Sequence, residues 1–318
     1  MTDQRVLVSD KLNQAGLDRL EEAPGVSWEM QTEWSPEELA QRIGEYDALI
    51  VRSGTQVTAE LIAAAPKLSA IARAGVGVDN IDLEAAAARG IPVMNSPTAN
   101  SITTAEQTLC LMLAVSRHTA PAHASVAAGE WRRGDFVGRQ LHGKALGVVG
   151  FGTIGRLVAE RARAFGLSIL AFDPYVNAEA GAALGAEMVD LATLLRKSDY
   201  VTLHAVVTDE TKHMIDAAAL ATMKPSAVLV NVARGALVDS AALAAALSSG
   251  GLAAAAIDVY ETEPPLGNPL IGLPNVLHTP HLGASTKEAQ EAVATQAVDA
   301  VLGVLRGEAP QFVVNGVS

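Results

Sequence analysis

Short apolar runs alternate with longer segments of helical periodicity along the first part of the chain. Helix start signals stand between the runs, including a capping box from Ser35 to Glu38 and possible N-cap residues at Thr58 and Asp82. Strands separated by helix-length spacers predict βαβ units and a parallel sheet. The runs that we interpret as strands are residues 6–8, 26–30, 48–51, 68–72 and 91–94.

The same alternation resumes after a long helix predicted over residues 103–117. This helix is apolar nearly all round, so we expect it to be buried, with Cys110 as a core thiol. Residues 118–143 show no clear period and are expected to be looser. Further strands are predicted at residues 145–149, 167–172, 200–203, 227–232, 252–260 and 276–277, and a last helix at residues 286–305. The pattern is typical of an α/β protein.

The most informative stretch is the strand, turn and helix around Gly150, Gly152 and Gly155, which form the pattern G-x-G-x-x-G. The helix that follows repeats apolar residues every three to four positions as far as Phe165. In such a motif the first glycine allows a tight turn, the second lets the backbone approach a pyrophosphate, and the third lets helix and strand pack closely. The helix N-terminus offers unpaired N–H groups to the phosphates. The stretch predicts a dinucleotide site; the alternative is a glycine-rich turn in another α/β protein.

An acidic residue stands where a dinucleotide site would need one. The apolar run 167–172 ends at Asp173, whose carboxylate can accept hydrogen bonds from the adenosine ribose hydroxyls. The same carboxylate would repel the 2′-phosphate of NADP, and Pro174 and Tyr175 follow it instead of an arginine. NAD is therefore the predicted cofactor.

Length, charge and cysteine content narrow the possible functions. The chain has 318 residues, enough for two domains, and a net charge of −12, which argues against nonspecific binding to nucleic acid or anionic membranes. No apolar run is long enough to span a bilayer and no signal peptide is evident, so we expect a cytoplasmic protein. The single cysteine excludes an intrachain disulfide and a multi-cysteine metal site, and no metal is predicted.

Three side chains with suitable chemistry, Arg234, Glu263 and His281, each follow a predicted strand. Ligands of parallel sheets bind at the carboxyl ends of strands, so the three could meet at one rim. The arginine fork can bind a carboxylate, the histidine can exchange a proton with a hydroxyl, and the glutamate can stabilise the imidazolium. A single residue of this kind at a strand end is more often a surface or hydrogen-bonding residue, and the three are singled out because they occur together downstream of a dinucleotide site. The histidines without an evident partner motif are His118, His123, His142 and His213.

Four segments of the chain have a distinctive sequence: Arg73-Ala-Gly-Val-Gly-Val-Asp-Asn, Asn231-Val-Ala-Arg-Gly, Asp258-Val-Tyr-Glu-Thr-Glu-Pro-Pro and Pro280-His-Leu-Gly-Ala-Ser. Through these segments the sequence resembles the D-isomer-specific 2-hydroxyacid dehydrogenase family, and most closely its D-3-phosphoglycerate dehydrogenase branch. The resemblance covers essentially the whole chain. It implies an NAD-dependent oxidoreductase that interconverts a D-2-hydroxy acid and its 2-keto acid. The implied substrate is D-3-phosphoglycerate or a similar anionic three-carbon hydroxy acid, with a role in serine biosynthesis.

The resemblance also implies the roles of individual residues. It makes Arg234, Glu263 and His281 the catalytic residues. The implied substrate-binding residues are Arg52, Ser53, Gly54, Val76, Gly77, Arg234 and His281. The implied NAD-binding residues are Val76, Gly150, Gly152, Thr153, Ile154, Gly155, Asp173, Ala205, Val232, Ala233, Asp258, Gly283 and Ala284.

The architecture implied by the resemblance is two Rossmann-like or flavodoxin-like parallel-sheet domains with an active-site cleft between them. The substrate-binding domain would comprise residues 1–98 plus 286–318, and the NAD-binding Rossmann domain residues 99–285. A homodimer or homotetramer is expected. One departure is Val206, where the family often has proline. Because the sequence ends at Ser318, the C-terminal regulatory domains of the long phosphoglycerate dehydrogenases, and serine feedback, are not expected.

Two alternatives remain open at this point. The substrate could be hydroxypyruvate, glyoxylate or another 2-keto or 2-hydroxy acid, because such acids differ only beyond C2; Arg52, Arg73 or Arg133 could hold a second anion. A function of another class is an NAD(H)-sensing, corepressor-like binding protein, since such relatives retain the same three residues. Turnover of a 2-keto acid with NADH would separate an enzyme from a sensor.

Overall fold

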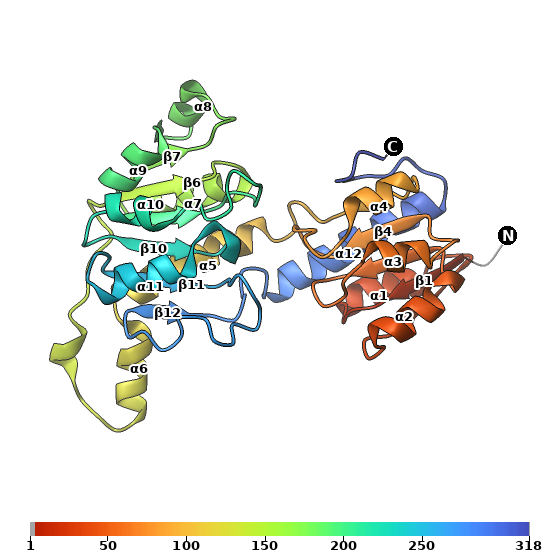
Figure 1. The fold of residues 1–318 in the computed structure, drawn as a ribbon, viewed down its shortest axis with the longest axis horizontal. Helices are drawn as coiled ribbons and strands as arrows, with labels where there is room; N and C mark the ends of the chain where they lie inside the picture. Colours follow the sequence, from red (N-terminus) through yellow and green to blue (C-terminus); the bar gives the residue numbers. More distant parts are fainter. Residues whose placement is uncertain (1–3, 318) are drawn as a thin grey trace. The chain divides into compact units, whose positions relative to one another are not determined.

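The computed structural model describes residues 4–317, and the chain divides into two compact units (Figure 1). One unit comprises residues 1–100 and 284–318, and the other comprises residues 101–283. The predicted boundaries, 1–98 plus 286–318 and 99–285, lie two residues away from these at each junction. Among the helices of the described residues, none is long and apolar enough to span a bilayer.

The first unit is built on a five-stranded parallel sheet in the order β2-β1-β3-β4-β5. This is the doubly wound order of flavodoxin-like folds. The sheet confirms the predicted strands, although the last one is shorter than expected. The strands are β1 (Gln4–Val8), β2 (Val26–Met30), β3 (Ala48–Val51), β4 (Ala70–Arg73) and β5 (Val93–Met94).

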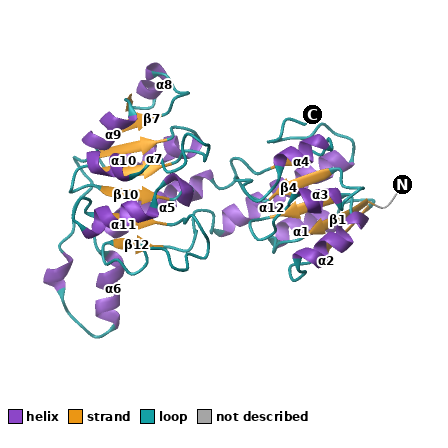
Figure 2. Cartoon of the chain, viewed as in Figure 1, coloured by secondary structure: helices purple, strands orange, loops and turns teal. Residues whose placement is uncertain are grey.

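Helices cover both faces of this sheet (Figure 2), so the central strand β3 is buried on both sides. Alternate residues of one strand show this: Val6 and Val8 pack with α1 and α12, whereas Leu7 packs with α2 and α3. Side-chain caps form at Ser35, Thr58 and Asp82 as predicted. The helices are α1 (Gln14–Glu21), α2 (Pro36–Arg42), η1 (Ile43–Glu45), α3 (Ala59–Ala63), α4 (Leu83–Ala88) and α12 (Lys287–Leu305).

The second unit contains a seven-stranded parallel sheet in the order β12-β11-β10-β9-β6-β7-β8. Read from β8, this is the Rossmann order, and the strand order reverses between β6 and β9. Ligands of such sheets bind beyond the carboxyl ends of the strands at that point. The strands are β6 (Ala145–Val149), β7 (Ser168–Phe172), β8 (Ala186–Met188), β9 (Tyr200–Leu203), β10 (Val228–Asn231), β11 (Ala254–Ile257) and β12 (Val276–His278).

Two hydrophobic clusters fill the two faces of this second sheet. One contains residues of α5 and α7, and the other contains residues of α9, α10 and α11. The α/β fold class with two parallel sheets is therefore confirmed. The helices are α5 (Ser101–Ser116), α6 (Thr119–Ala127), η2 (Arg133–Phe136), α7 (Thr153–Ala164), α8 (Ala178–Ala183), α9 (Leu191–Lys197), α10 (Ala217–Thr222), η3 (Gly235–Leu237) and α11 (Ser240–Ser248).

Three local predictions were wrong. Residues 118–143, expected to be loose, contain α6 and η2, and this segment projects from the sheet of its unit (Figure 1). Cys110, expected in the core, is exposed, because α5 buries the stripe that includes Thr108, Leu111 and Met112 and leaves the opposite side free. Phe165 is 45% exposed and caps the C-terminus of α7 instead of extending its buried face.

Candidate functional site

The three glycines of G-x-G-x-x-G occupy three different environments, as the motif requires. Gly150 has a φ of 88°, the left-handed conformation that a side chain disfavours. A Cβ on Gly155 would lie 2.1 Å from the carbonyl oxygen of Gly150, so only glycine allows this close packing. A Cβ on Gly152 would meet nothing within 4 Å, so open space lies beside the backbone there. The turn therefore has the form of a phosphate cradle.

The N-terminus of α7 and the Asp173 carboxylate complete the fit to a dinucleotide. The first turn of α7 has no side-chain cap at Gly152, which leaves its N–H groups for an anion. Asp173 directly follows β7, the neighbour of β6, and its two carboxylate oxygens accept the backbone N–H groups of Phe151 at 2.8 Å and Tyr175 at 2.9 Å. These bonds fix the carboxylate beside the glycine turn. The residues present therefore fit NAD.

An imidazole and a carboxylate meet in the segments that follow β11 and β12. His281 Nδ1 lies 2.7 Å from Glu263 Oε2, and both side chains are about half-exposed. The other oxygen of Glu263, Oε1, accepts the backbone N–H of Tyr260 at 3.1 Å. The predicted pairing of Glu263 with His281 is confirmed. With Nδ1 committed to the carboxylate, Nε2 is the ring nitrogen left for proton exchange.

The turn that carries His281 is held by the buried Asp258 carboxylate. Oδ1 accepts the N–H of Leu282 at 2.8 Å and the hydroxyl of Thr279 at 2.5 Å, and Oδ2 accepts the N–H of Gly283 at 2.9 Å. His281 itself has a φ of 55°, which is uncommon for a residue with a side chain. These three carboxylate contacts of Asp258 all hold the turn, and its predicted role in binding NAD stays a prediction.

Arg234 lies on the turn after β10, next to the strand that leads to Asp258. Asn231 shapes this turn with both ends of its amide: Oδ1 accepts the N–H of Ala233 at 3.1 Å, and Nδ2 donates to the carbonyl of Arg234 at 2.8 Å. The guanidinium donates from Nη1 to the Ala233 carbonyl at 2.7 Å. Because β10, β11 and β12 are neighbours in the sheet, Arg234, Glu263 and His281 all follow adjacent strand ends.

Residues at the ends of β9 and β10 complete the predicted NAD contacts in this unit. His204 and Ala205 follow β9 and approach the glycine turn, since a Cβ on Gly150 would lie 2.6 Å from the Ala205 nitrogen. Val232 and Ala233 follow β10. Thr153 and Ile154 begin α7, and Gly283 is buried in the His281 turn. Burial lowers the pKa of His204 to about 3.

The predicted substrate loops of the first unit follow β3 and β4. The backbone N–H of Arg52 donates to Asp10 Oδ2 at 2.6 Å, and the Arg52 guanidinium donates to the carbonyl of Lys11 at 3.2 Å. Asn80 Nδ2 donates to the carbonyls of Arg52 at 2.8 Å and Thr55 at 2.7 Å, which pins the loop containing Ser53 and Gly54.

The adjoining loop of the first unit carries Val76 and Gly77, and the carbonyl of Val76 accepts Asn95 Nδ2 at 2.6 Å. A Cβ on Gly75 would lie 1.8 Å from Arg73 Nη1, so the guanidinium of Arg73 folds over its own loop. Ala284 also belongs to this unit. Sequence reasoning missed Asp10, Asn80 and Asn95 as residues that hold these loops. Asn95 directly follows a predicted strand and Asp10 lies two residues after one, whereas Asn80 lies within a loop with no such signal.

A second histidine–carboxylate pair was also missed. His213 Nε2 lies 2.9 Å from Glu261 Oε2, although the sequence shows no evident partner motif for His213. The two residues are 48 positions apart, and neither lies in an element whose period would bring them together. Glu261, one member of this pair, is two residues from Glu263 along the chain.

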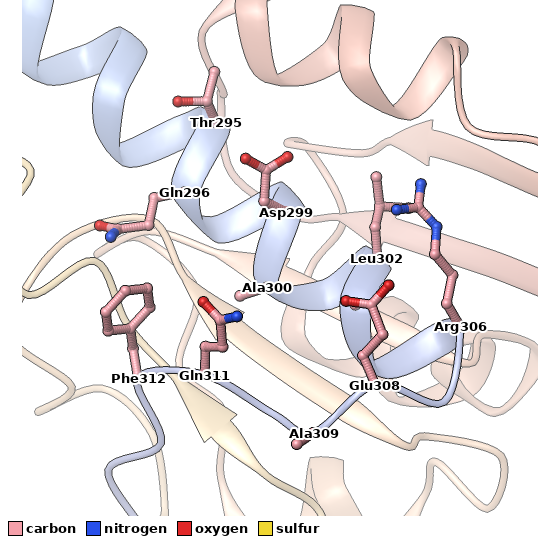
Figure 3. Close-up of a pocket in the computed structure, with 11 residues that line it drawn as sticks. Thr295, Gln296, Asp299, Ala300, Leu302, Arg306, Glu308, Ala309, Gln311 and Phe312 are labelled. Carbon is pink, nitrogen blue, oxygen red and sulfur yellow. The ribbon is translucent and has the colours of Figure 1, made fainter.

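Two hollows differ in their relation to these residues. One of about 390 Å³ lies beside Glu263 and His281 and is lined on its nonpolar side by Pro264, Pro265 and Ile271. Another of about 470 Å³ lies between the C-terminal half of α12 and the segment after it (Figure 3). None of the described residues that line this second hollow is a predicted site residue. Of these two hollows, the first flanks the pair formed by Glu263 and His281.

Comparison with known proteins assigns the family. Residues 109–283, more than half of the chain, match the family described as D-isomer specific 2-hydroxyacid dehydrogenase, NAD binding domain. The chain belongs to the D-isomer-specific 2-hydroxyacid dehydrogenases. The resemblance seen in the sequence is thereby confirmed, and the match agrees with NAD as the predicted cofactor.

Individual relatives of this 2-hydroxyacid dehydrogenase chain are similar over nearly all of it. D-3-phosphoglycerate dehydrogenase of Methanocaldococcus jannaschii is 48% identical over 98% of this chain and 59% of that protein. The corresponding enzyme of Mycobacterium leprae is 47% identical over 98% of this chain and 58% of that protein. The chain thus spans less than two thirds of the length of these curated relatives.

Two solved structures match this 2-hydroxyacid dehydrogenase chain over 99% or more of their own lengths. The TT0316 protein of Thermus thermophilus has a TM-score of 0.91 and 39% identity, covering 98% of this chain and 100% of that one. A glyoxylate reductase from Paecilomyes thermophila has a TM-score of 0.89 and 32% identity, covering 99% of each chain. The fold is therefore shared with relatives of different names.

Proposed function

We propose that this chain is an NAD-dependent dehydrogenase that interconverts a D-2-hydroxy acid and its 2-keto acid. The observation that carries the proposal is the contact of 2.7 Å between His281 Nδ1 and Glu263 Oε2, in the same unit as the glycine turn. NAD, when bound, would accept the hydride in oxidation and supply it in reduction. The residues of this unit proposed to hold it are Gly150, Gly152, Thr153, Ile154, Gly155, Asp173, Ala205, Val232, Ala233, Asp258 and Gly283.

In this proposal His281 moves the proton and Arg234 holds the substrate. His281 Nε2 takes the hydroxyl proton during oxidation and returns it during reduction. Glu263 fixes the ring through Nδ1 and stabilises the imidazolium when it forms. The planar guanidinium of Arg234 binds the carboxylate in a bidentate manner and polarises the adjacent carbonyl. Backbone N–H groups of Val76 and Gly77, with Arg52, Ser53 and Gly54, are proposed as further substrate contacts.

We propose D-3-phosphoglycerate, or a similar anionic three-carbon hydroxy acid, as the substrate, with a role in serine biosynthesis. The support is the name shared by the two relatives that are 48% and 47% identical. Arg52, Arg73 or Arg133 would hold the second anion. Reduction of glyoxylate or hydroxypyruvate is the second candidate, favoured by the similarity to a glyoxylate reductase. Fold similarity alone does not choose between them.

A substrate screen tests this proposal. Purified protein is assayed with 2-hydroxy and 2-keto acids, including phosphorylated, sulfonated and uncharged members, with NAD(H) and NADP(H). We expect turnover with NAD(H), highest kcat/KM for a phosphorylated three-carbon acid, and poor use of NADP(H). Highest kcat/KM for glyoxylate or lactate would reject the second anion site. Tight NADH binding without turnover of any acid would favour the corepressor-like alternative.

The proposal also includes a homodimer or homotetramer and a cytoplasmic location. The support for both is the membership in the 2-hydroxyacid dehydrogenase family. Light scattering at several protein concentrations measures the assembly, and fractionation of cells of the source organism measures the location. A monomer at all concentrations, or recovery outside the cytoplasm, would remove these parts of the proposal.

A further inference from the structure

The Glu261 carboxylate joins three segments of the second unit. Its Oε2 lies 2.9 Å from His213 Nε2. Its Oε1 accepts the Ser240 hydroxyl at 2.7 Å and the Ser240 backbone N–H at 3.3 Å. His213 precedes α10, Ser240 begins α11, and Glu261 lies in the loop after β11. The partly exposed Glu261 carboxylate therefore connects its own loop to two segments that are more than 20 residues away in the sequence.

The backbone next to Glu261 contacts Glu263 and the turn of Arg234, two residues with proposed catalytic roles. Glu261 directly follows Tyr260, whose backbone N–H donates to Glu263 Oε1 at 3.1 Å. The Tyr260–Glu261 peptide packs on the turn after Arg234: a Cβ on Gly235 would lie 1.9 Å from the carbonyl carbon of Tyr260. A shift of this peptide would therefore move Glu263 and the Arg234 turn relative to one another.

The His213 side of the contact is braced by backbone. His213 has a φ of 51°, and its N–H donates to the carbonyl of Ala236 at 2.8 Å, in the helical turn that follows Arg234. A side-chain residue in this left-handed region persists when its surroundings fix it, and such residues cluster at functional sites. Glu261 thus contacts one end of the segment 236–240 directly, at Ser240. It is connected to the other end, Ala236, through His213.

We propose that Glu261 is a positioning residue that fixes the loop 260–263 against the Arg234 turn and so holds Glu263 in its contact with His281. This inference rests on the proposed function, because it assigns Glu261 a purpose in the same reaction. Glu261 touches neither His281 nor Glu263 through its carboxylate; it acts through the Tyr260 backbone. Burial raises the pKa of the Glu261 carboxyl, but the hydrogen bonds from Ser240 and His213 lower this pKa by a larger amount. The net shift is therefore downward, and the group is ionised at neutral pH.

The test compares Glu261→Ala with Glu261→Gln, His213→Asn and a matched control. Asparagine tolerates the left-handed conformation of His213 and removes only the imidazole. The control is Glu29→Gln, because the Glu29 side chain is 35% exposed, as is that of Glu261, and also has two side-chain partners, Arg5 and Gln31. Each variant is first shown to be folded by circular dichroism and thermal melting.

Two readouts separate positioning from a merely structural role. The first is kcat, with NADH affinity measured by fluorescence: we expect kcat of folded Glu261→Ala to fall between about tenfold and a hundredfold, the scale of misplacing a catalytic group, with NADH affinity unchanged. The second is the titration midpoint of the His281 ring by NMR, which needs no turnover. We expect it to move in the same direction as in Glu263→Gln. Glu261→Gln and His213→Asn should lie between Glu261→Ala and wild type, and Glu29→Gln should match wild type.

The double variant Glu261→Ala, Glu263→Gln decides whether Glu261 acts through Glu263. We expect Glu261→Ala to add little to the effects of Glu263→Gln, since coupled residues are non-additive. Full additivity, or an unmoved His281 titration in folded Glu261→Ala, overturns the inference. Asp258 accepts the N–H of Leu282, and Tyr260 and His278 line the same hollow as His281; none of these ionisable residues is substituted in any of the variants. If wild type turns over no acid, the proposed function fails, but the NMR titration still tests Glu261.

Discussion

At the scale of single residues, the proposed catalytic pair owes its contact to restraints on both partners. The Asp258 carboxylate fixes the turn of His281 through three hydrogen bonds, and the Tyr260 N–H orients Glu263. Charge-assisted bonds of this kind are the stronger hydrogen bonds of proteins. The ring of His281 is therefore preorganised with Nε2 free for a substrate, which is the geometry that proton transfer requires.

Asp173 should set the preference for NAD. Its carboxylate is held beside the glycine turn, where it can accept ribose hydroxyls and repel a 2′-phosphate. In Asp173→Ala, we expect the discrimination between NAD and NADP to fall by about 1–3 kcal/mol. The measurement is kcat/KM with each cofactor, with Asp173→Asn as the control that keeps the size and loses the charge. Comparable kcat/KM for both cofactors in wild type would contradict this role.

His204 should make the folded state sensitive to acid. Burial lowers its pKa to about 3, and its Nε2 lies 3.0 Å from the Thr202 hydroxyl. In the unfolded chain His204 takes up a proton as pH falls through about 6.5, whereas in the folded chain it stays neutral until about pH 3. The contribution of neutral His204 to the free energy of unfolding is therefore present above about pH 6.5 and is lost as pH falls toward about 3. Because the residue as a whole is only partly buried, we expect a loss of about 1–3 kcal/mol and not the full shift.

Urea unfolding at pH 7 and pH 4.5 measures this effect. His204→Gln should show a smaller difference in the free energy of unfolding between the two values of pH than wild type. Equal pH dependence in the two proteins would contradict this account, because it would mean that His204 is protonated at pH 4.5 in the folded state as well.

At the scale of elements, two glycines of the turn before α7 have different roles: Gly155 allows close packing, and Gly152 leaves open space for a ligand. Gly155→Ala places a Cβ 2.1 Å from a backbone oxygen, so we expect destabilisation of about 1–3 kcal/mol. Gly152→Ala meets open space, so the free energy of unfolding should change by less than about 1 kcal/mol. NADH affinity, measured by fluorescence, should nevertheless fall in Gly152→Ala. The reverse order of the two stabilities would contradict these assignments.

Buried strands were readily predicted because their residues are apolar on both faces, as in β3, where all four residues are buried. Caps were predicted because a local residue pattern makes them, as at Ser35. The helix α6 was not predicted: its mixed small residues show no apolar stripe, and a single residue of it, Ser125, is buried. The exposure of Cys110 also depended on tertiary packing, since an apolar helix gives no indication of which side faces solvent.

At the scale of the whole molecule, the order of parallel strands explains which site residues the sequence could predict. Arg234, Glu263 and His281 follow β10, β11 and β12, which are neighbours, so a parallel sheet brings their loops to one edge. The contact between Glu261 and His213 depends on how two loops bend, and no period or motif encodes it. Local cations matter for the proposed function, because a chain of net charge −12 would have to attract the proposed anionic acid through Arg234 and helix N-termini.

Variants of Arg234 and Glu263 should fail in different ways. Arg234→Lys loses the planar fork, so we expect KM for the acid to rise without a change in the pH dependence of the reaction. Glu263→Gln keeps the size but loses the charge that stabilises the imidazolium, so we expect the pH dependence to change. Steady-state kinetics across pH distinguish the two; a pH transition that moves in Arg234→Lys would contradict the assignment of roles.

The most direct test of the proposed reaction is the pH profile of kcat/KM in both directions for wild type and Glu263→Gln. Reduction needs the imidazolium of His281 as proton donor, and oxidation needs the neutral ring as acceptor. For wild type, we predict that reduction falls and oxidation rises as pH increases through one shared transition. In Glu263→Gln both transitions should move to lower pH, with reduction near neutrality affected most. Profiles of Glu263→Gln that coincide with wild type would contradict the account.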